Sequence, residues 1–106
     1  MLETLDITSD IARLEERAGE AAGLLKMLAN ENRLLILCRL AVDGEVSVGD
    51  LVDKVSLSQS ALSQHLAKLR QEGLVGTRKD AQTVYYRITD DNAGRLLQLL
   101  KDIYCP

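Results

Sequence analysis

One segment in the second half of the chain, residues 57–88, constrains the fold more than any other. It begins with a helical pattern over residues 58–72, and Gly73 ends this pattern because glycine readily adopts the left-handed conformation found after a helix. Two alternating stretches follow, residues 74–79 and 83–88, with residues 80–82 as the turn between them. The segment therefore predicts one helix followed directly by a β-hairpin.

The first part of the chain reads as two longer helices. Apolar residues spaced by three and four predict a helix over residues 9–28, with Ser9 or Asp10 as its N-cap. Asn30 is the predicted cap of a second helix over residues 31–42. This second helix is apolar on nearly all sides, so we expect it to lie in the centre of the fold.

Shorter elements connect the second helix to the hairpin segment. Residues 45–47 predict a short strand, and a helix at about 48–55 follows, with Ser47 as its cap and Asp50 in its first turn. A tight link at residues 56–58 joins this helix to the next, which is the pattern of a helix-turn-helix. Asp90 or Asp91 is expected to cap a last helix that carries a broad apolar stripe up to residue 104.

Length and composition agree with one mainly helical unit. The chain has 106 residues, which predicts a single domain over residues 1–106. Aromatic residues make up only 3% and there is no Trp or Phe, so an aliphatic core of packed helices is favoured. The expected fold class is therefore mainly α with a small β-hairpin wing (α+β), a winged helix-turn-helix.

No apolar run of membrane-spanning length and no signal peptide are evident, so a cytoplasmic location without a membrane partner is expected.

The predicted first and last helices are more apolar than a small monomer should leave exposed. A chain of this length has few other layers that could cover them. Pairing of both helices with their copies in a second protomer would bury the apolar stripes around a two-fold axis. We therefore expect a homodimer with a helical interface.

The charge distribution favours a nucleic acid as the partner. The whole chain carries a net charge of −3, but by residue count residues 1–32 carry −4 and residues 58–88 carry +3. Attraction to phosphates depends on the local field of the contacting face, not on the sum over the chain. The basic region coincides with the predicted helix and hairpin.

The polar side of the predicted helix 58–72 suits the major groove of double-stranded DNA. A Gln side chain can hydrogen-bond two atoms of adenine, and Ser is a small donor or acceptor. A merely solvated face is the alternative, but such a face would normally carry Glu and Lys. The candidate base-reading residues are Gln59, Ser60, Ser63 and Gln64.

Further candidates surround these four. His65 is the only histidine, and contact with DNA and a structural role remain equally open for it. Basic side chains of the same helix and of the hairpin are placed to meet phosphates, although any one of them can instead be an ordinary solubilising charge. These basic candidates are Lys68, Arg70, Arg78, Lys79 and Arg87.

The two cysteines form the remaining candidate site. Cys38 lies in the predicted second helix and Cys105 at the end of the last one. In a cytosolic chain both are expected as thiols. Cys38 can be a small core residue and Cys105 an ordinary tail residue, or the two can form a redox pair if the last helix packs back over the second.

Two thiols and one histidine make no convincing zinc site, so no metal or cofactor is expected. No constellation of nucleophile, base and orienting group stands out, which argues against an enzyme.

The chain resembles the ArsR family of dimeric winged-helix repressors over nearly its full length. Residues 28–38, 45–51, 57–66 and 80–86 carry the resemblance. The family's arsenic-type site has cysteines where this sequence has Ser47 and Gly49. Its zinc-type site needs Asp and His on the last helix, and residues 90–105 contain no His. Both metal sites are therefore expected to be absent.

The resemblance is closest to the metal-independent, BigR/SqrR/HlyU-like branch. It implies that the reduced dimer binds a palindromic operator, and that persulfides or oxidants bridge Cys38 and Cys105 and change DNA affinity. It also maps DNA contacts onto Gln59, Ser60, Ser63 and Gln64. Two alternatives stay open. One is a constitutive DNA-binding regulator or anti-silencer with inert cysteines, and the other is a metal-responsive ArsR-type repressor.

Overall fold

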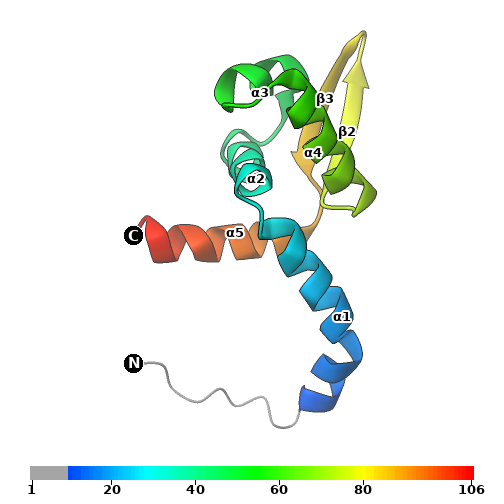
Figure 1. Ribbon diagram of the computed structural model, residues 1–106, viewed down its shortest axis with the longest axis vertical. Helices are drawn as coiled ribbons and strands as arrows, with labels where there is room; N and C mark the ends of the chain where they lie inside the picture. The colour runs from blue at the N-terminus through cyan, green and yellow to red at the C-terminus, as the bar shows by residue number, and fades with distance from the viewer. Residues whose placement is uncertain (1–9) are drawn as a thin grey trace.

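The computed structural model describes residues 10–106, which form five helices and three short strands (Figure 1). The helix-turn-helix and the hairpin lie at one end of the molecule, and α1 runs away from them (Figure 1). In chain order the elements are α1 (Ile11–Leu28), α2 (Glu31–Asp43), β1 (Val46–Ser47), α3 (Val48–Lys54), α4 (Gln59–Gln71), β2 (Val75–Asp80), β3 (Thr83–Ile88) and α5 (Asp91–Tyr104).

Side-chain caps fix where the helices begin. The side chain of Asn30 accepts a hydrogen bond from the N–H of Arg33 at 3.0 Å, and Ser58 accepts one from Ala61 at 3.1 Å. Ser47 caps α3 and Asp90 caps α5 in the same way. The predicted caps Asn30, Ser47 and Asp90 are therefore confirmed, and the cap at Ser58 is a finding of the structure. The first helix differs: Asp10 is its N-cap but makes no side-chain cap bond. The alternative cap, Ser9, lies outside the described residues.

The three strands form one antiparallel sheet in the order β1-β3-β2. Pairing of Val75 with Ile88 through Asp80 with Thr83 makes β2 and β3 the predicted hairpin wing. The turn is shorter than predicted, because Asp80 belongs to β2 and only two residues remain. Ala81 adopts a φ of +56° there. This left-handed conformation is unusual for Ala, so the sequence carried little signal for so tight a turn.

The core is aliphatic and centres on α2, as predicted. This helix packs against α4, α5 and β3. The seven largest fully buried side chains come from α2, α3 and α4: Ile36, Leu37, Leu40, Leu51, Leu62, Leu66 and Leu69. The expectation that α2 is covered on nearly all sides is wrong on one face, where Leu35 is 54% and Val42 is 77% exposed. That face lies open.

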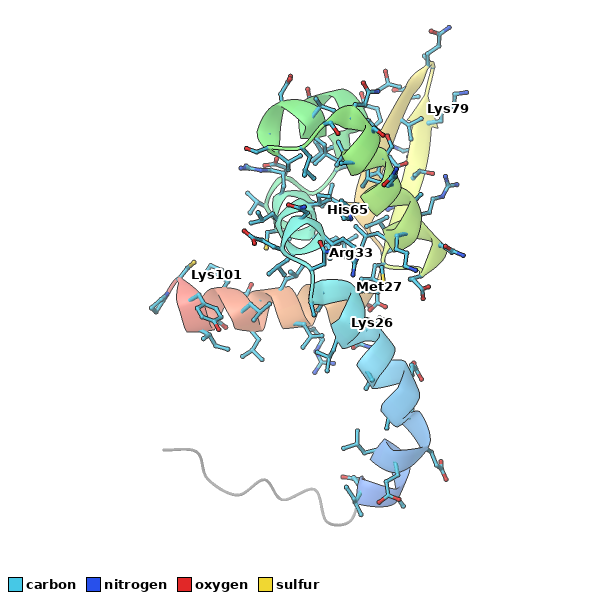
Figure 2. The ribbon with its side chains drawn as sticks, viewed as in Figure 1. Lys26, Met27, Arg33, His65, Lys79 and Lys101 are labelled. Atoms are coloured by element: carbon cyan, nitrogen blue, oxygen red, sulfur yellow. The ribbon has the colours of Figure 1, made fainter. Side chains whose placement is uncertain are left out.

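The side chain of Arg33 ties the end of α1 to α2 (Figure 2). Its Nε donates to the carbonyl oxygen of Met27 at 2.9 Å, and its Nη2 donates to that of Lys26 at 3.1 Å. Carbonyls in the last turn of a helix lack partners within the helix, and a cation there also complements the helix dipole. Arg33 therefore links α2 to the last turn of α1 through two hydrogen bonds.

Much of α1 and the C-terminal half of α5 leave apolar side chains exposed. Only the last two residues of α1, Met27 and Leu28, are buried. The exposed large apolar residues on these two helices are Ile11, Leu14 and Leu25 on α1, and Leu99, Ile103 and Tyr104 on α5. Within residues 10–106 no helix combines the length and the apolar character needed to cross a membrane.

Candidate DNA interface and cysteine pair

The helix α4 has a buried side and an exposed polar side. Leu62, Leu66 and Leu69 are buried and recur at the spacing of one helical face. All four predicted base-reading residues are exposed, and so are Lys68 and Arg70. The structure therefore brings Gln59, Ser60, Ser63 and Gln64 to the first two turns of one accessible helix, the end that recognition helices commonly present to bases.

The histidine of α4 lies between these two sides. His65 is half-buried, three residues after the buried Leu62 and four before the buried Leu69. Side chains three and four residues apart on a helix are neighbours, so His65 borders the core side of α4. A structural role and a contact at the edge of the helix are both compatible with this place.

In the wing, Arg78 is held by an acidic residue next to β1. The carboxylate of Glu45 accepts hydrogen bonds from Arg78 Nε at 3.0 Å and Nη2 at 2.7 Å. The guanidinium also lies over the ring of Tyr85, 4.7 Å from its centroid. The hydrogen bonds from Arg78 are the main reason that the pKa of Glu45 is lowered. Arg78 therefore joins the wing to the residue before β1.

The other basic residues of the wing are less constrained. Arg87 Nη1 lies 3.9 Å from Glu45 Oε2, the outer limit of an ion pair. Lys79 is exposed and pairs with Val84, near the end of the hairpin (Figure 2). Over the part of the chain that the structure describes, Lys79 makes no salt bridge, and neither do Lys68 and Arg70 on α4.

The two cysteines lie on helices that pack together. Cys38 is half-buried on α2 and packs against the core, while Cys105 is exposed and caps the end of α5. The N–H of Cys105 donates to the carbonyl oxygen of Lys101 at 2.7 Å, on the last turn of α5 (Figure 2). The helices α2 and α5 contact each other, so the two cysteines lie on elements that are packed together.

The electrostatics of Cys38 link it to Cys105. Burial is the larger cause that raises the pKa of the Cys38 thiol, and the charge of Cys105 raises that pKa further. Charges influence each other appreciably only over short distances in a protein. Both cysteines are free thiols. Within residues 10–106, the two cysteines included, no group of three or more His, Cys, Asp or Glu side chains could hold a metal ion.

Sequence reasoning missed two residues that connect distant elements of the fold. Glu45 was taken only as part of a strand, because its partner Arg78 is 33 positions away and the strand pairing was not known. Arg33 was not singled out either, although a basic residue shortly after a helix end is a known signal for capping of carbonyls. Both residues make hydrogen bonds between different secondary-structure elements, and the spacing of residues within one element carries little information about such contacts.

Comparison with known proteins agrees with this geometry. Residues 30–77 match the family model described as bacterial regulatory protein, arsR family. The chain is 50% identical to the transcriptional activator HlyU of Vibrio cholerae over 96 residues, which covers 91% of this chain and 88% of the relative.

Two solved structures have nearly the same fold. Reduced HlyU from Vibrio cholerae superimposes with a TM-score of 0.82 at 51% identity, covering 89% of this chain and 98% of the other. The transcriptional repressor BigR from Xylella fastidiosa has a TM-score of 0.82 at 41% identity, covering 90% and 96%. These confirm the predicted winged-helix fold, and their names are those of regulators, not enzymes. The chain therefore belongs to the ArsR family of DNA-binding transcriptional regulators, in the branch that contains HlyU and BigR.

Proposed function

We propose that this regulator binds a palindromic operator as a homodimer, and that a bridge between Cys38 and Cys105 changes its affinity for that operator. The observation that carries the proposal is the packing of α5 on α2 together with the influence of the Cys105 charge on the Cys38 thiol. The inducing signal is a reactive sulfur species or an oxidant that acts on the two thiols.

The proposed reading of DNA rests on the exposed face of α4 and on the wing. Gln59, Ser60, Ser63 and Gln64 contact base edges in the major groove, with His65 at the edge of that face. Contacts to phosphates come from the basic side chains around this face, of which Arg78 and Arg87 already face Glu45. These phosphate-binding residues are Lys68, Arg70, Arg78, Lys79 and Arg87.

The proposed dimer uses the exposed apolar residues of α1 and α5. Large apolar side chains on these helices, such as Leu14 at 47% and Ile103 at 56% exposure, gain free energy if a second copy covers them. A two-fold dimer places two copies of α4 on one side of the assembly, which matches the symmetry of a palindromic operator.

The proposed switch uses sulfur transfer. A thiolate of one cysteine attacks the terminal sulfur of a persulfide R–S–SH, and the S–S bond breaks with release of R–S⁻, which takes up a proton. The thiolate of the other cysteine then attacks the inner sulfur of this new persulfide, which is Sγ of the first cysteine. The S–S bond of the persulfide breaks, HS⁻ leaves, and a disulfide between the two cysteines remains. If a second persulfide first extends the chain by one sulfur, attack on the middle atom leaves a trisulfide and again expels HS⁻.

A bridge of either length would fasten the end of α5 to α2. Because α2 also supports α4 and β3, a fixed α5 would alter the position or mobility of the DNA-reading helix. Since α5 also belongs to the proposed dimer interface, the spacing of the two reading helices would change with it. A bias of about 1–3 kcal/mol between DNA-competent and incompetent states corresponds to roughly 5- to 150-fold in affinity.

A second candidate function is a DNA-binding regulator whose cysteines are inert. The half-burial of Cys38 and the raised pKa of its thiol favour this alternative, because the neutral thiol is a poor nucleophile. Under this alternative, thiol reagents leave the operator affinity unchanged, and the protein acts by occupying DNA or by displacing another protein.

The intact mass of the folded, reduced protein after exposure to a persulfide or to peroxide tests the proposal. Added sulfur with loss of both free thiols, seen only with the persulfide, supports a sulfur-specific switch. A loss of two hydrogens with either reagent supports a general dithiol switch. Unchanged mass and two remaining free thiols overturn the switch and select the inert alternative.

A further inference from the structure

A pocket opens at Cys38, on the face of α2 that the core leaves uncovered. Its volume is about 330 Å³, within the range of sites that hold small molecules. It lies between α2 and the link that joins α3 to α4. Residues that line it include Leu35, Cys38, Arg39, Val42, Lys54 and Leu57.

The lining combines apolar side chains with positive charge. Arg39 and Lys54 are the charged residues of the lining, and no carboxylate belongs to it. The nearest counter-charge is Asp43, whose Oδ2 lies 2.9 Å from Lys54 Nζ and 4.0 Å from Arg39 Nη1. Two cations and one carboxylate leave a net charge of +1 at the pocket. Of the two contacts with Asp43, the one from Arg39 is the longer.

The two cations act at the rim of the pocket and not on the sulfur of Cys38. The pKa of this thiol is raised by burial and by Cys105, and neither Arg39 nor Lys54 contributes to lowering it. A cation placed to activate Cys38 would favour the thiolate and lower the pKa. The positive charges are therefore available to a ligand that enters the pocket.

We propose that this pocket binds an organic persulfide whose carbon skeleton carries a carboxylate, and that it delivers the donor sulfur to Cys38. The inference rests on the thiol switch proposed above and names its sulfur donor. Arg39 and Lys54 attract the carboxylate, while Leu35 and Val42, which are otherwise exposed, pack against the carbon skeleton.

The site also suits the transfer step itself. The Cys38 thiolate forms a bond to the terminal sulfur of R–S–SH, the bond between the two donor sulfurs breaks, and R–S⁻ leaves with the electron pair before it takes up a proton. Negative charge moves from Cys38 to the departing sulfur inside the pocket. Fixed positive charge at the rim stabilises that charge and holds the donor close to a thiol that is mostly protonated at neutral pH.

The charge preference of Cys38 can be measured without a persulfide. In a Cys105→Ser protein, Cys38 is the one remaining thiol, since the chain has two cysteines. Iodoacetate and iodoacetamide are similar in size, share the leaving group and differ in charge, so the ratio of their alkylation rates at low salt reports the field that the reagent meets in the pocket. Lys54→Gln and Arg39→Gln should each lower the iodoacetate rate about threefold and leave the iodoacetamide rate nearly unchanged.

Two further variants make the measurement specific. Asp43→Asn removes the counter-charge, so it should raise the iodoacetate rate and leave the iodoacetamide rate unchanged. Lys79→Gln, in the wing, is the matched control and should change neither rate. Equal ratios in the parent protein and in all three pocket variants would overturn the pocket. Circular dichroism of each variant ensures that the comparison is made on folded protein.

Persulfides complete the test. Mercaptopropionate persulfide, whose carbon skeleton carries a carboxylate, should transfer sulfur to Cys38 faster than mercaptoethanol persulfide, which carries a hydroxyl in its place, and Lys54→Gln should remove the difference. Equal transfer rates would reject the pocket even if the full chain still forms its Cys38–Cys105 bridge. A clear preference for the carboxylate-bearing donor without any bridge in the full chain would instead reject the switch and leave the pocket standing.

Discussion

The carboxylate of Glu45 accepts two hydrogen bonds from the guanidinium of Arg78, at 3.0 and 2.7 Å, and so joins the wing to the start of the sheet. Arg87 approaches the same carboxylate at 3.9 Å. Part of the positive charge of the wing is therefore neutralised within the protein. The pKa of Glu45 is lowered, chiefly by the hydrogen bonds from Arg78, so the pair persists in mild acid and is lost only as the pH falls through that lowered value.

This pairing predicts opposite salt responses for two wing variants. Lys79→Gln removes an exposed charge that has no salt bridge in the described residues, so the slope of log affinity against log salt should become shallower by about one. Glu45→Gln frees Arg78 for phosphate, so the slope should become steeper by up to about one. Fluorescence anisotropy with a duplex selected from a random pool by the wild-type protein measures both. A shallower slope for Glu45→Gln would contradict the proposed phosphate role of Arg78.

The exposed face of α4 predicts a local loss of sequence discrimination. If Gln64 reads a base as proposed, Gln64→Ala should cost about 1–3 kcal/mol of preference at one base pair in each half-site, because a Gln side chain can bond two atoms of adenine. Gln71→Ala is the matched control, since Gln71 is also exposed but ends the same helix. Competition binding with singly substituted duplexes measures the preference. Equal effects of the two variants would show that the first turns of α4 do not read bases.

The cap of α4 predicts a change in stability. Ser58 accepts a hydrogen bond from the N–H of Ala61 at 3.1 Å, and Ser58→Ala should lower the free energy of unfolding by about 1 kcal/mol. At one fixed protein concentration Tm should fall by roughly 4–8 °C. Ser63→Ala, in the exposed part of the same helix, should change stability by less than about 0.5 kcal/mol. A drop of similar size in both variants would argue against the cap as its cause.

The environment of Cys38 predicts a shifted pH profile. Because burial and the charge of Cys105 both favour the neutral thiol, the alkylation rate of Cys38 should rise at higher pH in the folded protein than in the denatured protein. Cys105→Ser should move the profile back only part of the way, since burial is the larger cause. Alkylation with iodoacetamide, resolved by peptide mass, follows Cys38 alone. No shift of the profile on Cys105→Ser would mean that the two thiols do not influence each other.

The sequence predicted local features of the fold well. The predicted caps at Asn30 and Ser47 fix the starts of α2 and α3, because each depends on a side chain and a backbone N–H three residues later. The exposed face of α4 also followed from residue spacing. What the sequence did not predict depends on contacts between distant elements. The Glu45–Arg78 pair needs the sheet pairing, and the open side of α2 with its pocket depends on how α3 and α4 sit around that helix.

The most direct test of the central claim compares the DNA affinity of the reduced protein with that of the purified Cys38–Cys105-bridged form, at one salt concentration. The account predicts that bridging weakens binding by roughly 5- to 150-fold and that a reductant restores it. Cys38→Ser protein given the same persulfide should bind as tightly as the untreated protein. Equal affinity of the bridged and reduced forms, or an equal loss of affinity in Cys38→Ser, would contradict the account.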